Sequence, residues 1–289
     1  MPAGTGSGAS ASARLPIGVC LRTIRAEPGW WLESARRLDD AGYAGLWAWD
    51  HFMGRGDRTV PVVESWTILS MAAACTSRAT VGPFVANVMN RHPALLARMA
   101  STLQVASGGR LLLGIGIGGA PREHEAYGMT FPDATERVAR LEEAVAVLRA
   151  LWTGGPVTRS SPFYPLLDAF AQPVPEPPPP IIIGGETVAG ARLAGRIGDG
   201  WSEFDTNFEA NLPAYLDALA ENGRERAGQQ VIVGFQGDWL SDEPITDSSW
   251  VNEPRETWTH WHEAGADGAI VLARTRADVD ALVGAVDRW

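Results

Sequence analysis

An acidic side chain and an imidazole stand next to each other at Asp50 and His51, directly after a short apolar run that ends near Trp49. Histidine changes charge easily near neutral pH, so this pair could act as catalytic acid and base or contact a cofactor. Trp49 is then a candidate wall of the substrate pocket. A second interpretation stays open, in which Asp50 caps a loop amide and His51 is a polar rim residue. His51 has no second ligand at a metal-binding spacing, so we expect no metal.

A run of glycines with two isoleucines, residues 114–119, matches the dinucleotide pattern GxGxxG in form. That pattern needs a helix to open immediately after the glycines, so that its N-terminus faces a pyrophosphate. Here Pro121 follows, and the next strong helical pattern begins only at Ala134. We therefore do not expect a Rossmann dehydrogenase. The glycines indicate either close approach of the backbone to something flat or bulky, or small residues that fill a barrel interior.

Two further glycines, Gly184 and Gly185, precede Glu186 and Thr187 and a helical pattern. Glycines before a helix expose amide donors beside the positive end of the helix dipole, which suits a phosphate. A plain tight turn between strand and helix is the alternative.

The apolar segment 80–87 contains two unusual features. Pro83 and Phe84 interrupt it, and proline inside a strand indicates a bulge because it cannot donate to the ladder. Asn87 ends the segment and could hydrogen-bond the edge of a heterocycle, or it could be a turn residue at the strand end.

The elements that must position these residues alternate eight times between short apolar runs and longer stretches of helical period. The predicted strands are Ile17–Leu21, Leu46–Asp50, Thr80–Asn87, Leu111–Ile117, Ile181–Ile183, Trp201–Phe204, Val231–Phe235 and Ala269–Leu272. Eight strand–helix units predict a single-domain α/β fold, the (β/α)8 or TIM barrel. An open, doubly wound sheet is the alternative. In a barrel the catalytic groups follow the strands at their carboxyl ends.

The barrel should occupy residues 14–289. Residues 1–13 are rich in Gly, Ala and Ser and predict a flexible N-terminal tail, with no signal peptide pattern. A Pro-rich segment at 155–180 predicts an excursion before the fifth strand, because the four prolines at 177–180 cannot join a helix or a central strand.

Composition excludes several classes of partner. The net charge is −10, the chain contains Arg but no Lys, and no basic run occurs. We therefore expect no nucleic-acid partner. No apolar stretch is long enough to span a bilayer, so we expect no membrane segment. Cys20 and Cys75 lack metal or disulfide spacing and indicate free thiols in a reducing, cytoplasmic location.

Four segments taken together resemble the luciferase-like monooxygenase superfamily of flavin- or F420-dependent oxidoreductases. They are residues 41–47 with the Asp50–His51 pair, Asn90-Arg91-His92-Pro93, residues 107–116, and Gly198-Asp199-Gly200-Trp201. The likeness runs from about Ile17 to Trp201 and weakens afterwards. It implies a TIM barrel that binds reduced FMN or coenzyme F420 at its mouth, and family members are often homodimers.

The resemblance also implies roles for individual residues. The Asp50–His51 pair is similar to the F420-using branch, where these residues lie beside the deazaflavin. A strand bulge, often with a non-prolyl cis peptide, backs the ring there, and here it would fall near Pro83–Phe84. The Gly184–Gly185 turn is similar to the family's phosphate contact. Sugar-phosphate dehydrogenases of this branch have a Glu where Gly119 stands, which argues against sugar-phosphate oxidation.

Our leading hypothesis is an F420-dependent oxidoreductase that moves a hydride between the deazaflavin and a small organic substrate. His51 would donate or accept a proton, Asp50 would orient a hydrogen bond, and Ile117, Gly118 and Gly119 would pack closely against the cofactor. Two alternatives stay open. One is an FMN-dependent monooxygenase that uses O2 and a separate reductase, and the other is a non-catalytic flavin-binding barrel.

Overall fold

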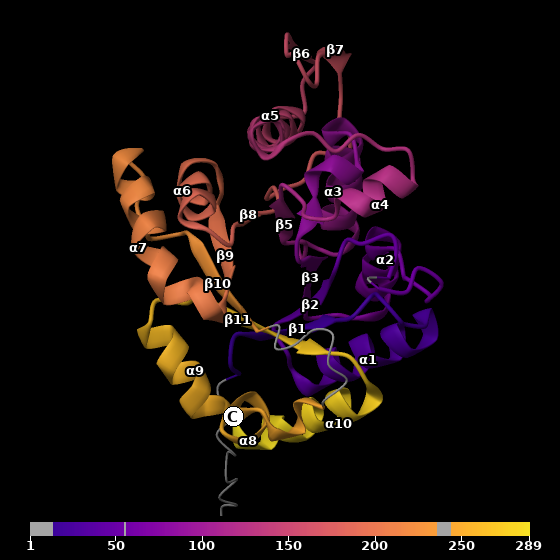
Figure 1. The fold of residues 1–289 in the computed structure, drawn as a ribbon, viewed down its shortest axis with the longest axis vertical. Helices are drawn as coiled ribbons and strands as arrows, with labels where there is room; N and C mark the ends of the chain where they lie inside the picture. Colours follow the sequence, from indigo (N-terminus) through magenta and orange to yellow (C-terminus); the bar gives the residue numbers. More distant parts are fainter. Residues whose placement is uncertain (1–13, 55, 236–243) are drawn as a thin grey trace, which may run out of the picture.

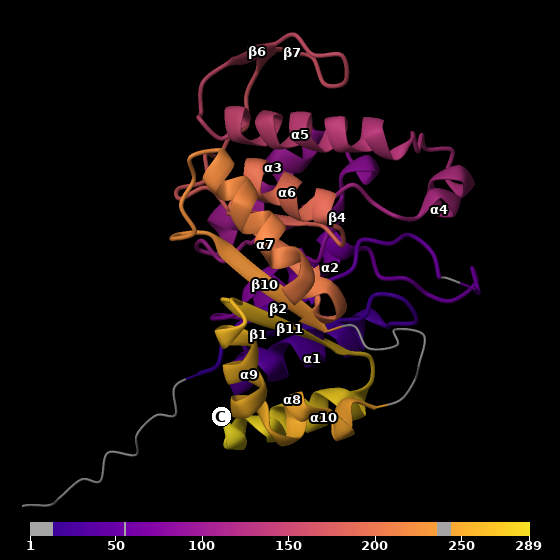
Figure 2. The same ribbon diagram turned by 60° about the vertical axis from the view of Figure 1, so that its left-hand side comes forward.

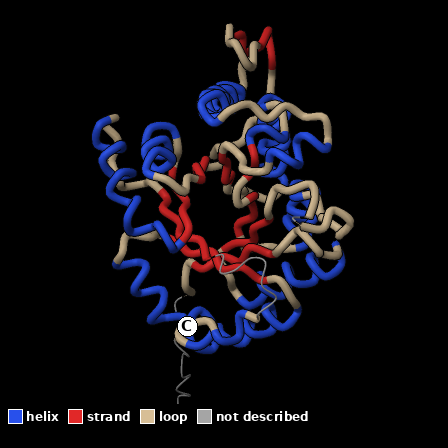
Figure 3. The backbone as a smooth tube through the Cα atoms, in the orientation of Figure 1, coloured by secondary structure: helices blue, strands red, loops and turns tan. Residues whose placement is uncertain are grey.

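A ring of parallel strands forms the centre of the protein, and helices surround it (Figures 1 and 3). The computed structural model describes residues 14–54, 56–235 and 244–289, so the predicted tail at 1–13 lies outside the described residues. Neighbouring strands follow the order β3-β2-β1-β11-β10-β9-β8-β5-β4. Their bounds are β1 Ile17–Leu21, β2 Gly45–Ala48, β3 Thr80–Pro83, β4 Ala86–Asn87, β5 Leu113–Gly116, β8 Ile181–Gly184, β9 Gly200–Phe204, β10 Gln230–Phe235 and β11 Gly268–Ala273.

The ring closes between β3 and the residues before β5. The Val81 amide donates to the Arg110 carbonyl at 2.8 Å, and the Leu112 amide donates to the Val81 carbonyl at 3.0 Å. β3 and β4 form one barrel strand that is interrupted at Phe84 and Val85, as the proline predicted. The first half pairs with β2 and the second with β5. Counting them as one leaves eight barrel strands, and the (β/α)8 prediction is confirmed.

Helices connect successive strands and form the outer layer. The long ones are α1 Pro28–Ala41, α2 Ser65–Cys75, α3 Pro93–Ala106, α5 Ala134–Leu151, α6 Val188–Ile197, α7 Asp205–Glu221, α9 Pro254–Glu263 and α10 Arg276–Ala285. Two short helices, α4 Pro121–Ala126 and α8 Ser249–Asn252, were not predicted. α4 corrects the sequence argument that no helix opens soon after the glycines, although it has only six residues.

Local sequence explains where these helices start and stop. α1 begins with Pro28 in its first turn, where a missing amide costs nothing, and ends at Gly42 with a φ of 102°. The carboxylate of Glu64 accepts hydrogen bonds from the amides of Trp66 and Thr67 and so caps α2. None of the described helices is both long and apolar enough to cross a membrane.

The Pro-rich excursion forms a hairpin of β6 (Val157–Arg159) and β7 (Leu166–Ala169). Figures 1 and 2 show it standing beyond α5, away from the barrel. Contacts with α5 hold its base. Ser161 hydrogen-bonds to Glu143, and the guanidinium of Arg140 lies 4.6 Å from the ring centre of Phe163.

Apolar side chains fill both sides of the barrel wall. Alternate strand residues point inward, and the interior cluster consists of Cys20, Trp47, Leu112, Ile182, Ile232, Ile270 and Leu272, with Trp49 and Phe84 packed against it. The other strand residues, such as Val19 and Leu21, pack against the helices. The barrel is therefore solid below its mouth, and a ligand can enter only at an end.

Candidate active site at the carboxyl ends of the strands

The predicted site residues lie at, or just after, the carboxyl ends of neighbouring strands. Trp49, Asp50 and His51 follow β2, and Asn87 ends β4. Residues 117–119 follow β5, and Gly184 and Gly185 stand at the end of β8. Because the strands are parallel, these groups share one end of the barrel, where the active sites of such barrels lie.

Asp50 lies inside a network of donors. Its side chain is 1% exposed and forms a two-pronged ion pair with Arg91, at 2.7 and 2.9 Å. The Ser65 hydroxyl donates to it at 2.8 Å, the Asn87 amide at 3.0 Å and the Asn90 side chain at 3.1 Å. With both oxygens engaged, this carboxylate holds the loop after β2 to the end of β4 and is not directed at a ligand.

Arg91 connects Asp50 to Glu64. Its second nitrogen lies 2.6 Å from Glu64 Oε1. Burial acts to lower the pKa of Arg91, but the charges and hydrogen bonds of Asp50 and Glu64 outweigh it and raise the pKa. Arg91 therefore stays cationic, and both of its terminal nitrogens are paired with carboxylates.

His51 turns away from Asp50 and pairs with Glu123 instead. Its Nδ1 lies 2.9 Å from Glu123 Oε1, and its side chain is 23% exposed while that of Glu123 is 4% exposed. The other carboxylate oxygen accepts a hydrogen bond from the Phe52 amide at 3.4 Å. Sequence reasoning missed Glu123, because it stands on the unpredicted helix α4. The acid that partners the imidazole is therefore not its neighbour in sequence.

α4 is fixed over the strand ends by His124. This fully buried imidazole lies 3.0 Å from the Ala120 carbonyl and 3.5 Å from Asn87 Nδ2, and it packs on Phe131 with ring centres 4.6 Å apart. The Asn87 side-chain oxygen accepts the Met89 amide at 2.9 Å. Asn87 is thus buried and used inside the protein, which favours its interpretation as a turn residue.

Aromatic rings form the floor of the mouth. Phe84 lies 6.3 Å from Trp47 and 6.4 Å from Phe204 between ring centres. Trp49 is half-buried on the same interior cluster. The Phe84–Val85 peptide bond is cis, one bond beyond the predicted position near Pro83–Phe84. Pro83 itself is buried as the last residue of β3.

Most of the glycines make room for the protein's own atoms. A Cβ on Gly114, Gly116 or Gly184 would lie 3.0 Å from a methyl group of Val85. A Cβ on Gly118, whose φ is +76°, would collide with the Asn87 side chain at 2.3 Å. The Asn87 side chain and the positive φ therefore require a glycine at position 118, and its contact with a cofactor stays a prediction.

Gly119 and Gly185 are the remaining predicted positions in the two glycine runs. Nothing lies within 4 Å of a Cβ on Gly119, so open space adjoins it, and the neighbouring Ile117 is half-buried against the core. A Cβ on Gly185 would lie 2.7 Å from the backbone of Gly190 in α6, and the Gly185 amide donates to the Ser202 carbonyl at 3.1 Å. The Gly185 amide is therefore already used.

A small pocket of about 270 Å3 adjoins the imidazole. Its lining residues are His51, Phe52, Val62, Glu64, Tyr127 and Met129. It is mainly apolar, with an imidazole and a carboxylate at its wall, as ligand pockets usually are. No group of three potential metal ligands occurs within the described parts of the chain.

The sequence matches known proteins over most of its length. The F420-dependent glucose-6-phosphate dehydrogenase of Kineococcus radiotolerans is 36% identical over 205 residues, which are 68% of this chain and 60% of that protein. The corresponding enzyme of Beutenbergia cavernae is 32% identical, over 84% of this chain and 72% of that protein. The F420-dependent hydroxymycolic acid dehydrogenase of Mycobacterium tuberculosis is 31% identical, over 66% of this chain and 54% of that protein. The chain spans about 60% of the length of the first two glucose-6-phosphate dehydrogenases that it matches.

Solved structures agree with the fold. An F420-dependent secondary alcohol dehydrogenase, in complex with an F420–acetone adduct, superposes with a TM-score of 0.79 at 20% identity, over 94% of this chain and 97% of the other. The F420-dependent tetrahydromethanopterin reductase of Methanopyrus kandleri gives 0.73 at 18% identity, over 95% and 97%. The model of the luciferase-like monooxygenase family matches residues 17–237. With its barrel, its interrupted third strand and this match, the chain belongs to the luciferase-like monooxygenase family.

Proposed function

We propose that this protein is an F420-dependent oxidoreductase that transfers a hydride between the deazaflavin and a small organic substrate. The observation that carries the proposal is the His51–Glu123 pair, which stands at the mouth of the barrel beside an apolar pocket. The relatives named F420-dependent dehydrogenases support the choice of cofactor.

The residues at the mouth suit a flat ring. The half-buried rings of Trp49 and Phe84 provide an apolar surface, and the open space at Gly119 leaves room on one side. Ile117 adds a half-buried apolar side chain beside it. Gly184 and Gly185 remain the proposed phosphate side, although the Gly185 amide is engaged. Bound there, F420 would supply the hydride acceptor or donor.

His51 would move the proton that accompanies the hydride. In the neutral imidazole, an Nδ1–H donating to Glu123 leaves Nε2 as the proton acceptor. Glu123 fixes the ring orientation and stabilises the imidazolium after protonation. Asp50 acts through its contacts with Arg91 and Ser65, which hold the loop that carries His51.

FMN-dependent monooxygenation with O2 and a separate reductase is the second candidate, because the family model that matches is named for that activity. A non-catalytic flavin-binding barrel is the third. Titration of the protein with F420 and with FMN, followed by turnover of a secondary alcohol and of glucose 6-phosphate, separates the three. Tight binding of F420 and its reduction by one substrate support the proposal, whereas binding of FMN alone contradicts it.

The remaining proposals concern partners and location. We propose a homodimer and a cytoplasmic location. Cys20 and Cys75 are unpaired, which suits a reducing compartment. We also propose that a sugar phosphate is a poor substrate, because Gly119 stands where the sugar-phosphate dehydrogenases of this branch have a Glu.

A further inference from the structure

The pocket beside His51 is formed by two loops that are far apart in the sequence. Phe52 and Val62 belong to the loop between β2 and α2, and Tyr127 and Met129 follow α4. Tyr127 is 58% exposed and the other three are half-buried, so Tyr127 lies at the outer edge. Together they place an apolar surface next to an imidazole, the side chain best suited to move a proton near neutral pH.

Contacts between the two loops fix the shape of this pocket. The Tyr127 hydroxyl donates to the Phe52 carbonyl at 3.1 Å, and the two rings meet edge to face with their centres 5.6 Å apart. The Met129 amide donates to the His124 carbonyl of α4 at 2.8 Å. α4 also carries the carboxylate that orients the imidazole. The same short helix therefore positions the catalytic pair and the outer wall of the pocket.

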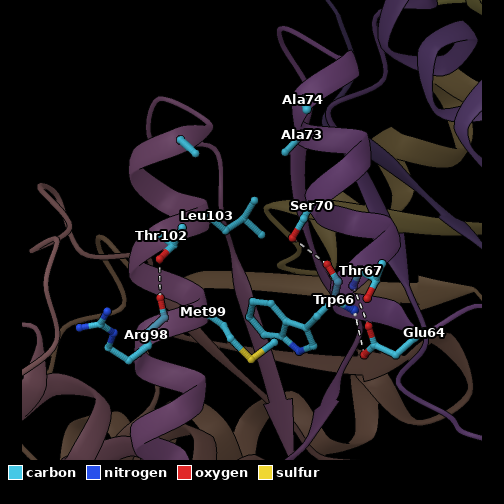
Figure 4. A pocket seen from close by; sticks show the side chains of 11 residues that line it. Glu64, Trp66, Thr67, Ser70, Ala73, Ala74, Arg98, Met99, Thr102 and Leu103 are labelled. Carbon is cyan, nitrogen blue, oxygen red and sulfur yellow. Dashed lines mark hydrogen bonds between the residues drawn. The ribbon is translucent and has the colours of Figure 1, made fainter.

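The charged residue in the pocket lining, Glu64, is already engaged inside the protein. It lies 2.6 Å from a nitrogen of Arg91. It also accepts the amides of Trp66 and Thr67 at 3.2 and 2.7 Å, so its carboxylate is turned back onto the start of α2 (Figure 4). The hydroxyl groups of a sugar would find few partners in this lining, whereas a hydrocarbon chain loses no hydrogen bond on entering it.

We propose that this pocket binds a hydrocarbon substituent of the substrate, and that the substrates are medium-chain secondary alcohols and their ketones. The reacting oxygen would meet Nε2 of His51, because Nδ1 is held by Glu123. The pocket measures about 270 Å3, and one water molecule, which is close to a methylene group in size, takes up about 30 Å3. A chain of about five to seven carbons therefore fits. This inference rests on the proposed function for its reaction and adds the class of substrate.

A series of 2-alkanols with F420 and the full chain tests the size and polarity of the pocket. Each methylene group that becomes buried should raise kcat/KM by about threefold, so 2-heptanol should exceed 2-propanol by roughly 80-fold. The increase should stop once the pocket is full. It should appear in KM more than in kcat, because the chain is bound equally before and during hydride transfer. The corresponding 2-alkanones with reduced F420 test the opposite direction.

Substitutions of Met129 connect this chain-length preference to the pocket. Met129→Trp should lower the ratio of kcat/KM for 2-heptanol to that for 2-propanol by about tenfold or more, because the indole occupies space that the chain needs. Met129→Ala enlarges the pocket and should move the best substrate to a longer chain. Leu216→Trp introduces the same ring at a 38% exposed position on α7, and as the matched control it should keep the wild-type ratio.

Binding of 2-heptanone to the cofactor-free wild type gives a readout that requires no turnover. The chain has six methionines, so the methyl groups of labelled methionine give few NMR signals, and Met129→Leu identifies the signal of Met129. That signal should shift when 2-heptanone is added and should stay in place with glucose 6-phosphate.

Three results would each overturn the pocket assignment. They are equal kcat/KM for 2-propanol and 2-heptanol, an unchanged ratio in Met129→Trp, and a Met129 signal that does not respond to 2-heptanone. A Met129 signal that shifts in a protein without any F420 turnover would support the pocket and contradict the proposed function, so the two failures can be told apart.

Discussion

The Nδ1 atom of His51 lies 2.9 Å from Oε1 of Glu123, although the two residues are 72 positions apart in the chain. Glu123 is buried, and its other oxygen accepts the Phe52 amide. The imidazole is therefore held in one orientation at the mouth of the barrel, which is the arrangement that a general acid or base requires.

Replacing His51 tests this role directly. His51→Gln should lower kcat/KM by about 10²- to 10⁴-fold, the usual contribution of a general acid or base, and should leave F420 affinity nearly unchanged. Glu123→Gln should cause a smaller loss, because it keeps a hydrogen bond but removes the charge. Steady-state kinetics and F420 titration measure both effects. His260→Gln, at an exposed position near Glu209, is the control. Full activity of His51→Gln would remove His51 from the mechanism.

The Asp50–Arg91 pair should matter chiefly for stability. Asp50→Asn leaves Arg91, which is 10% exposed, without half of its counter-charge, and breaking such a buried pair costs about 3–5 kcal/mol. Urea denaturation followed by circular dichroism measures the loss. Asp280→Asn removes one partner of an exposed pair with Arg37 and should cost less than about 1 kcal/mol. Equal stabilities of the two variants would show that the Asp50 network is not a structural support.

Gly118 and Gly119 are neighbours with opposite expected tolerance. Gly118→Ala places a Cβ 2.3 Å from Asn87 Oδ1 at a positive φ, and such crowding and strain cost about 1–3 kcal/mol. Gly119→Ala meets open space and should leave the free energy of unfolding within about 0.5 kcal/mol of wild type. Thermal and urea unfolding compare them. A similar loss in both variants would point to a common backbone requirement instead.

Asp39 should make stability depend on pH. Burial acts to raise its pKa, but hydrogen bonds from the amides of Ser77, Ala79 and Arg78 outweigh it and lower the pKa from its ordinary value of 3.8. A lowered pKa in the folded state means that the unfolded chain binds the proton more readily. The stabilisation is therefore complete above about pH 4 and is lost as the pH falls through the folded-state value.

The difference in unfolding free energy between wild type and Asp39→Asn should therefore be constant from pH 5 to 7, at about 2 kcal/mol, and should shrink below pH 4. Asp40→Asn, at a side chain that is 84% exposed, is the control and should show little difference at any pH. If the difference in unfolding free energy between wild type and Asp39→Asn grew as the pH fell, the ionised carboxylate would destabilise the fold.

The barrel could be predicted from the sequence because its strands are short apolar runs between helical patterns. β1 has the expected bounds, Ile17–Leu21. The proline at 83 also indicated the interruption of the third strand. α4 could not be predicted, because its six residues have no helical period and only Pro121 marks its start.

The site was predictable in its location but not in its pairing. The position after β2 placed Asp50 and His51 at the mouth, yet their side chains point to Arg91 and to Glu123. The glycines were recognised as sites of close approach, but the approaching group is Val85 or Asn87 of the same chain. Such contacts depend on how distant segments pack, which a single sequence does not show.

The central claim is that the barrel mouth binds F420 and uses it for hydride transfer. Titration of F420 and FMN, observed by fluorescence, followed by the absorbance change of bound F420 on addition of a secondary alcohol or glucose 6-phosphate, tests it most directly. The account predicts tight binding of F420, weaker binding of FMN, and reduction of F420 that is lost in His51→Gln. Binding of FMN alone, or oxidised F420 that is not reduced by any alcohol together with reduced F420 that is not oxidised by any ketone tried, would contradict it.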